Sequence, residues 1–131
     1  MSEPGEKQGI APKWRWRIWL AYVVAWTTAL LLPVGTSASW TVGELQIDLK
    51  FLFAKTVHVS AYAVLAGLSG WLRVPYRHRW LLLFFIMAHG TVTELLQLHI
   101  PNRTGTLIDV GFDNLGVAIG LIATRRWWSE P

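Results

Sequence analysis

The sequence predicts an all-α integral membrane protein, a bundle of four transmembrane helices with the N- and C-termini in the cytoplasm. Three observations lead to this class: an apolar composition, four long apolar segments and an uneven distribution of basic residues. Of 131 residues, 53% are hydrophobic and only 15% are charged, whereas a soluble domain usually carries about 25% charged residues. Cysteine is absent, which excludes disulfides and thiolate metal sites.

The four apolar segments cover residues 18–34, 51–72, 80–98 and 107–124. Each is close to the ~20 residues that a helix needs to cross a bilayer. Residues 14–128 therefore form one membrane domain. Residues 1–13 are predicted to be a disordered cytoplasmic tail, residues 44–50 an interfacial approach to the second helix, and residues 73–79 ("RVPYRHR") a short cytoplasmic turn broken by proline.

The basic residues set the predicted orientation. If the N-terminus is inside and the helices alternate, nine basic residues lie inside, and only Lys50, Lys55 and Arg103 lie outside. This positive-inside bias is typical of bacterial inner-membrane proteins, and most tryptophans fall at the same inner interface. An alternative is a signal peptide cleaved after Ala38, within "GTSASW". The tryptophans around the first apolar run favour an uncleaved anchor.

Ionisable residues recur at one depth on three of the helices. At 1.5 Å per residue, Glu94, His58 and Asp113 stand roughly 21, 20 and 18 Å above the inner boundary. Helical spacing puts each of them on a stripe of polar or small residues. The stripes are Lys55, His58 and Tyr62; then Gly90, Thr93, Glu94 and Gln97; then Asp109, Asp113, Gly116 and Gly120.

A charge at the helix centre costs ~2.5–3.5 kcal/mol on the most lenient insertion scale. The stripes should therefore face one another around one polar pocket, open to the outside. The turn "PNRTGT" would hold Arg103 over the pocket mouth, either to bind an anion or to pair with Asp109 or Glu94. Thr106 is expected to cap the fourth helix, with Asp109 in its first turn.

The motifs "KTVHVSAYAVL" and "TELLQLHIPNRTGTLIDVGFDNLGVAIG" resemble the VanZ-like family of small bacterial membrane proteins. The resemblance covers roughly residues 50–121. The matching positions are Lys55, His58, Glu94, Gln97, Pro101, Arg103, Asp109, Asn114, Gly116 and Gly120. The chain departs from the pattern at Ala54 and Thr93, where members often carry an acidic residue. The resemblance implies a role in the cell envelope, because the founding member is linked to low-level resistance to the glycopeptide antibiotic teicoplanin.

The leading hypothesis is therefore a protein that binds or modulates an envelope lipid, a lipid-linked wall precursor or an amphiphilic drug. The predicted binding pocket comprises Lys55, Tyr62, Gln97, Arg103, Asp109, Asp113 and Asn114. The alternative is a small intramembrane enzyme acting on a lipid-linked envelope substrate. In that case His58 and Glu94 would form the catalytic acid–base pair, with Arg103 as an anion clamp. A proton-coupled carrier is disfavoured, because four short helices enclose little pathway.

Other assignments follow from the same residues. An alternative interpretation makes His58, Glu94, Asp109 and Asp113 the ligands of a divalent metal. Lys55 and Arg103 would oppose a cation there, so no metal and no cofactor is predicted. Gly116 and Gly120 form a GxxxG element for close helix packing, in the bundle or across a homo-oligomer, with the bundle favoured. His89 is expected to be a hydrogen-bonded structural histidine, and His99 receives no role. Membrane lipids are the expected partners, and nucleic acid is not.

Overall fold

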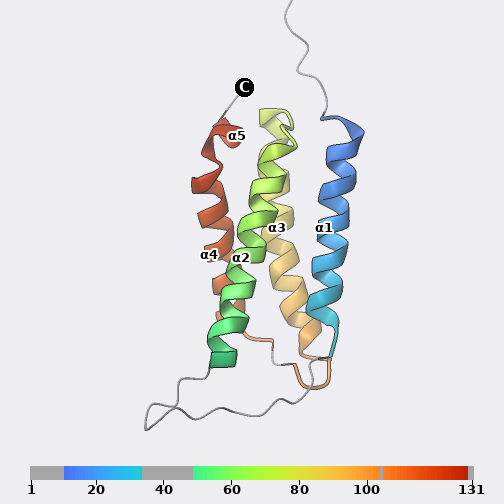
Figure 1. The fold of residues 1–131 in the computed structure, drawn as a ribbon, viewed down its shortest axis with the longest axis vertical. Coiled ribbons are helices and arrows are strands. Elements are labelled where there is room, and N and C mark those ends of the chain that lie inside the picture. The colour runs from blue at the N-terminus through green and yellow to red at the C-terminus, as the bar shows by residue number, and fades with distance from the viewer. Residues whose placement is uncertain (1–10, 34–48, 104, 130–131) are drawn as a thin grey trace, which may run out of the picture.

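The computed structural model describes residues 11–33, 49–103 and 105–129. The described residues form only α-helices and their connections, so the all-α class is confirmed. The helices are α1 (Lys13–Leu31), α2 (Leu49–Trp71), α3 (Tyr76–Gln97), α4 (Leu107–Ala123) and the short α5 (Arg125–Ser129). Figure 1 shows the four long helices side by side along the long axis of the molecule.

Successive long helices run in alternating directions (Figure 1). The end of α1, the start of α2 and the connection from α3 to α4 lie at one end of the bundle, which we call the cluster end. The start of α1, the connection from α2 to α3 and α5 lie at the other, which we call the basic end. In consequence α2 and α4 run parallel, and these two helices make the most extensive contact in the bundle.

Local sequence explains where the helices begin and end. Pro33 follows α1 by two residues, and a proline cannot continue a helix. The predicted turn over residues 73–79 is wrong in its second half, because Pro75 is the N-cap of α3 and the chain is helical from Tyr76. Arg73 takes the left-handed conformation (φ 51°) that commonly ends a helix.

The start of α4 agrees with the sequence prediction. Thr106 is its N-cap, and the threonine Oγ1 accepts a hydrogen bond of 3.1 Å from the Asp109 N–H. Asp109 therefore stands in the first turn, where a carboxylate also interacts favourably with the helix dipole.

Three predictions concern segments outside the described residues. The tail over residues 1–13 falls mostly there, although its last residue, Lys13, already belongs to α1. The alternative cleavage site after Ala38 lies there entirely. The interfacial approach over residues 44–50 does too, apart from the start of α2 at Leu49.

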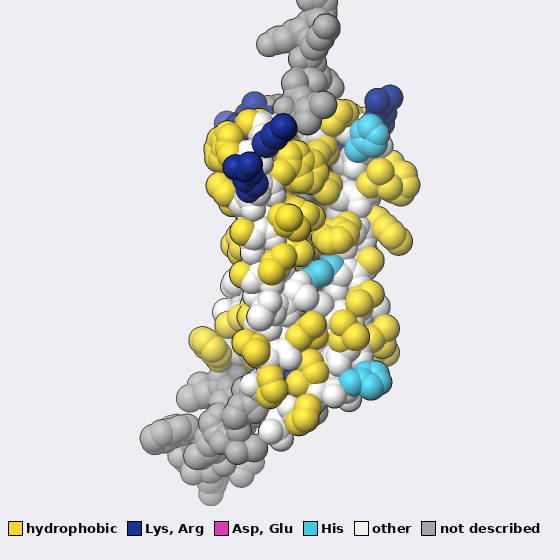
Figure 2. Space-filling model, turned by 90° about the vertical axis from the view of Figure 1, so that its right-hand side faces the viewer, with side chains coloured by type: hydrophobic (Ala, Val, Ile, Leu, Met, Phe, Trp, Pro, Cys, Tyr) yellow, Lys and Arg dark blue, Asp and Glu magenta, His cyan; other side chains and the backbone are white. Residues whose placement is uncertain are grey.

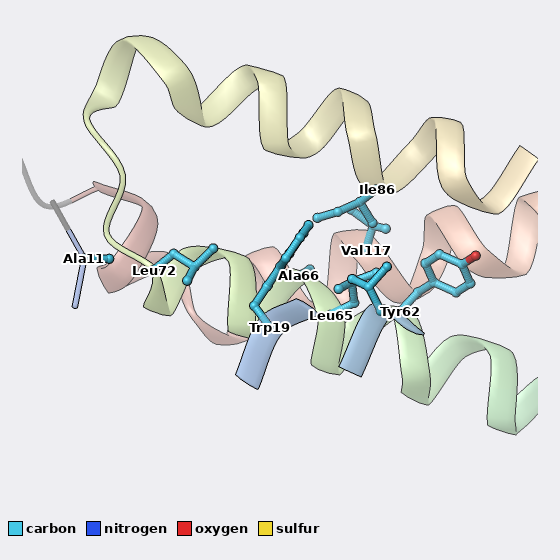
Figure 3. Packing of buried hydrophobic residues seen from close by; sticks show 9 residues of the cluster. Ala11, Trp19, Tyr62, Leu65, Ala66, Leu72, Ile86 and Val117 are labelled. Atoms are coloured by element: carbon cyan, nitrogen blue, oxygen red, sulfur yellow. The ribbon is translucent and has the colours of Figure 1, made fainter. Parts of the chain in front are cut away.

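The buried hydrophobic side chains form a row between the helices (Figure 3). Ala11 and Leu72 lie at one end of this row, Leu65, Ala66 and Ile86 lie further along it, and Tyr62 lies at the other end. Tyr62, Leu65, Ala66, Leu72 and Ile86 are fully buried. The row thus leads from the basic end of the bundle toward the polar residues of the cluster end.

The outer surface carries many large apolar side chains. Phe53, Leu107 and Ile122 are each at least 65% exposed. Figure 2 shows that hydrophobic side chains are spread along the whole height of the visible face, while lysine and arginine gather toward the basic end. Such a large exposed apolar surface is unusual for a soluble monomer.

Two of the described helices are long and apolar enough to cross a membrane: α2 over Phe51–Trp71 and α3 over Tyr76–Gln97. Only 33% of the apolar window of α2 and 28% of that of α3 is buried inside the protein. A core helix of a soluble protein would be mostly buried. Helices α1 and α4 do not meet this criterion of length and apolar character. Helix α1 begins with arginines and tryptophans, which lower its mean hydropathy, and α4 has only 17 residues.

Candidate functional site

Five ionisable side chains meet near the cluster end of the bundle, and we call them the polar cluster: Lys55 and His58 from α2, Glu94 from α3, and Asp109 and Asp113 from α4. Glu94, Asp109 and Asp113 are each at most 4% exposed and His58 is 8% exposed. The Lys55 side chain is 13% exposed. The structure therefore brings together, in a buried position, residues that the sequence placed on three separate stripes.

The cluster has two layers, separated by about one helical turn. In the outer layer, nearer the ends of the helices, the Lys55 ammonium forms an ion pair with the Asp109 carboxylate. In the inner layer, Nδ1 of His58 lies 2.8 Å from Oδ1 of Asp113 and 3.8 Å from Oε1 of Glu94. His58 therefore contacts both carboxylates of its layer.

The turn before α4 connects the two layers. The Thr106 N–H donates a hydrogen bond of 3.0 Å to Oε2 of Glu94, and the Thr106 hydroxyl donates one of 2.9 Å to Oδ2 of Asp109. Gly105 makes this possible, because a Cβ at that position would overlap the backbone oxygen of Glu94. Gly105 and Thr106 thus bring their backbone directly against α3.

Two buried oxygens of the inner layer lack a partner. Oε1 of Glu94 and Oδ2 of Asp113 accept no hydrogen bond from any residue that the structure describes. Buried polar atoms nearly always have a partner, and an unpartnered one calls for an explanation. The cluster therefore has spare acceptor capacity at its centre.

Helix α1 also reaches the cluster, which the sequence did not indicate. The Trp26 ring stands edge-on to the rings of His58 and Tyr62, with ring centroids 5.8 and 6.3 Å apart. Thr27 Oγ1 lies 2.7 Å from Nε2 of His89, and Nδ1 of His89 lies 2.9 Å from the Tyr62 hydroxyl. His89 thus has a partner on each ring nitrogen, as expected for a structural histidine. The sequence argument considered only ionisable residues at one depth in the membrane, so it could not identify the uncharged Trp26 and Thr27.

Arg103 lies differently from the prediction. Its Nε and a terminal nitrogen donate to the backbone oxygens of Leu32 (3.1 Å) and Ala29 (2.9 Å), at the end of α1. It forms no ion pair with Asp109 or Glu94 in the described structure, and Lys55 occupies Asp109 instead. Partial burial lowers the pKa of the Arg103 guanidinium, while the charge of Glu94 acts in the opposite sense. The last carbonyls of a helix have no partner within it and attract a cation, which explains this position.

The other predicted pocket residues lie around the cluster rather than in it. The Gln97 amide donates to the Leu30 backbone oxygen (3.0 Å), which ties α3 to α1. The Asn114 amide donates to Val110 of its own helix (2.9 Å). Gly116 and Gly120 pack α4 against α2 inside the bundle, since a Cβ at either glycine would overlap a backbone oxygen of α2.

Two small cavities reach the cluster from its sides. One of about 180 Å³ is lined by Glu94, Thr106 and apolar residues of α3 and α4. Another of about 220 Å³ is lined by Lys55, Phe112 and neighbouring residues of α2. A larger apolar cavity of about 580 Å³ lies at the basic end, between Trp16, Trp19 and Phe85, away from the cluster. The described cluster is thus packed on itself, with a small cavity on two of its flanks.

Comparison with known proteins gives no relative for this chain. No protein-family model matches it, and neither a curated protein nor a solved structure does. The VanZ-like resemblance therefore stays a prediction, based on the motifs around Lys55, Glu94 and Asp109.

Proposed function

We propose that this chain is a VanZ-like multi-pass protein of the bacterial inner membrane, which spans the bilayer four times with both termini in the cytoplasm. Its polar cluster binds or modulates an envelope component: a membrane lipid, a lipid-linked wall precursor or an amphiphilic drug such as teicoplanin. The observation that carries the proposal is the burial of five ionisable side chains inside a bundle with an apolar exterior. Ionisable residues at membrane depth are functional-site candidates by default.

The dimensions of the bundle support four spans. Helix α1 has 19 residues and α4 has 17, which at 1.5 Å per residue makes them roughly 28 and 26 Å long. These lengths are close to the ~30 Å hydrocarbon core of a bilayer. Both helices lie alongside α2 and α3 (Figure 1), and both expose apolar side chains such as Leu20 and Ile119.

The charge distribution supports the orientation. Eight basic residues belong to α1, α3, α5 and the connections at the basic end, whereas Lys55 and Arg103 are the basic side chains described near the cluster end. The positive-inside rule puts the basic end in the cytoplasm. The cluster then lies in the outer half of the membrane, within reach of lipid-linked molecules of the outer leaflet.

This orientation can be tested directly, because the chain has no cysteine. We would introduce single cysteines at His99, an exposed residue near the cluster end, and at Ser129, an exposed residue of α5. A membrane-impermeant maleimide should label His99→Cys in intact spheroplasts and Ser129→Cys only after permeabilisation. Labelling of Ser129→Cys in intact spheroplasts would contradict the proposed topology.

The contacts of the cluster indicate what kind of ligand group it accepts. Lys55 and Arg103 both have partners, so neither is available as an anion clamp. The unpartnered oxygens of Glu94 and Asp113 are acceptors. An ammonium, amide or hydroxyl group of a ligand matches them best, and Glu94 also lines one of the two small cavities.

One observation favours the alternative, a small intramembrane enzyme acting on a lipid-linked envelope substrate. His58 lies 3.8 Å from Glu94 and is held by Asp113 at 2.8 Å. A base beside an imidazole that a second carboxylate orients is a common arrangement for proton transfer. In this alternative Glu94 and His58 are the acid–base pair. The enzyme would also need Arg103 as an anion clamp, but Arg103 donates to backbone oxygens of α1 instead. Binding is therefore the function we favour.

The deciding experiment compares wild type, Glu94→Gln and His99→Gln in cells that lack the native protein, at matched membrane abundance. Sensitivity to teicoplanin and to other wall inhibitors is scored. Glutamine keeps the acceptor for the Thr106 N–H but cannot act as a base. A partial loss of phenotype in Glu94→Gln supports binding and a complete loss supports the enzyme, with His99→Gln unchanged in both cases. A wild-type phenotype in Glu94→Gln would contradict a functional role for the cluster.

A further inference from the structure

We propose that His58, Glu94 and Asp113 bind one divalent transition-metal ion between α2, α3 and α4. This inference assigns the two unpartnered oxygens of the inner layer to a metal ion instead of to the donor group of an envelope ligand, and its test does not depend on the envelope role. The sequence argued against a metal site here. The contacts of the described residues now support one.

The three side chains already converge. One ligand atom from each, the imidazole nitrogen and one oxygen from each carboxylate, lies within 4.8 Å of the other two. Metal–ligand bonds of ~2.0–2.2 Å in a tetrahedral site place neighbouring ligand atoms roughly 3.3 Å apart. The distance from His58 Nδ1 is 2.8 Å to Oδ1 of Asp113 and 3.8 Å to Oε1 of Glu94, on either side of that value. Metal binding then requires the imidazole and the two carboxylates to adjust their side-chain torsions, so that either oxygen of Asp113 can serve as the ligand.

Two unpartnered carboxylate oxygens indicate that a cation can bind between them. Oε1 of Glu94 and Oδ2 of Asp113 have no hydrogen-bond partner among the described residues, although both residues are at least 97% buried. A buried carboxylate oxygen without a donor loses its hydration and gains nothing in return. A metal ion between the two carboxylates would satisfy both oxygens at once.

The charges of the neighbours point the same way. The sequence argued against a cation because Lys55 and Arg103 were expected in the pocket. In the structure Lys55 is paired with Asp109, and Arg103 donates to the carbonyls of α1. The inner layer then holds two carboxylates and one imidazole. A divalent cation balances the two negative charges when the imidazole is neutral, which is the form that binds metals.

The surroundings of the three side chains also suit a metal site. Gly90 faces it, and a Cβ at that position would come within 3.1 Å of Oδ2 of Asp113 and 3.4 Å of the Tyr62 hydroxyl. A larger residue at position 90 would therefore crowd the Asp113 carboxylate. The Thr106 N–H holds the second oxygen of Glu94, an outer contact of the kind that orients metal ligands. One imidazole and two carboxylates suit zinc, manganese or iron rather than copper(I).

The test uses the full chain, purified in detergent micelles without a polyhistidine tag. The protein is stripped with EDTA, dialysed against Zn²⁺ or Mn²⁺, and its metal content is measured by mass spectrometry. We expect about one metal ion per chain for one of these metals. His58→Gln and Asp113→Asn should each weaken affinity at least ~10-fold. His99→Gln, which removes an exposed histidine two residues after the end of α3, should bind as wild type.

A second measurement keeps the test valid if a variant fails to fold. The melting temperature of the wild type is recorded with the metal and again after EDTA, and a ligand that binds only the folded state should raise it reversibly. A wild type that holds no more metal than the His58→Gln/Asp113→Asn double variant, or whose melting temperature does not respond, overturns the proposal. These readouts come from purified protein, so they stand apart from the drug sensitivity that tests the envelope role.

Discussion

Nδ1 of His58 lies 2.8 Å from Oδ1 of Asp113, across the interface of α2 and α4, although 55 residues separate them in the chain. This contact belongs to a continuous seam between two parallel helices. Lys55 meets Asp109 one turn before it, and Gly116 approaches Val59 one turn after it. Polar pairing and close glycine packing thus occupy successive turns of one interface, so the glycines control how closely the charged residues meet.

The first prediction concerns that packing. Gly116→Ala and Gly120→Ala should each destabilise the protein by about 1–3 kcal/mol, because the added Cβ overlaps a backbone oxygen of α2, on Val59 or Ala63, and forces the helices apart. Gly111→Ala, in the same helix, meets nothing within 4 Å and should stabilise by about 0.5–1 kcal/mol. Unfolding in mixed micelles, followed by circular dichroism, measures all three. Equal effects at the three positions would contradict the assigned seam.

The second prediction concerns the ion pair of the outer layer. Lys55→Met should destabilise by about 3 kcal/mol, because it leaves the buried Asp109 carboxylate uncompensated. Adding Asp109→Asn should recover part of this loss, which a double-mutant cycle measures as a coupling free energy. The control Lys13→Met changes an exposed lysine of α1 and should shift stability by less than about 0.5 kcal/mol. Additive single effects would show that the pair is not coupled.

The sequence was sufficient to predict how the ionisable residues gather. Helical periodicity assigns His58, Glu94 and Asp113 to faces, and the cost of charge at membrane depth requires those faces to meet. Both arguments depend only on residue type and spacing. The N-cap at Thr106 is also predictable, because a threonine before an apolar run with an acidic residue three positions later is a local signal.

The remaining features depend on packing that spacing does not encode. Arg103 is drawn to the carbonyls of Ala29 and Leu32, more than 70 residues earlier in the chain. No local pattern distinguishes that choice from a nearby carboxylate. Trp26 and Thr27 enter the site because α1 lies beside α2 and α3, a fact of tertiary structure. For the same reason, the sequence could not decide whether Lys55 opposes a metal ion. Lys55 opposes a cation only if its ammonium pairs with a carboxylate of the inner layer, and its pairing with Asp109 instead depends on tertiary structure.

The third prediction concerns the hydrogen bonds that link Tyr62, His89 and Thr27. Tyr62→Phe keeps the buried ring but removes the partner of His89 Nδ1, so it should destabilise by about 1–3 kcal/mol. Tyr22→Phe is the matched control: the Tyr22 hydroxyl donates to the backbone oxygen of Ala61, an acceptor within a helix, and its loss should cost only about 0.5–1.5 kcal/mol. The comparison uses the same micelle unfolding assay. A smaller effect at Tyr62 than at Tyr22 would contradict the structural role of His89.

The last prediction separates two roles for Arg103. As a cap on α1, its guanidinium donates to two carbonyl oxygens at once, 2.9 and 3.1 Å away. Arg103→Lys keeps the charge but cannot reproduce this fork. We therefore expect a loss of about 1 kcal/mol in unfolding free energy, since a bond to a charged group contributes about 1.5–3 kcal/mol and the lysine retains part of it.

The control for Arg103→Lys is Arg77→Lys, at an exposed arginine of α3, which should leave stability within about 0.5 kcal/mol of wild type. The two roles then give opposite patterns. A capping arginine changes unfolding while drug sensitivity of the cells, at matched abundance, stays as in wild type. An anion clamp at the mouth of the site would leave unfolding unchanged and alter drug sensitivity, because lysine binds an anion as a point charge without the two-point geometry of arginine. The second pattern would show that Arg103 leaves the end of α1 when ligand is present.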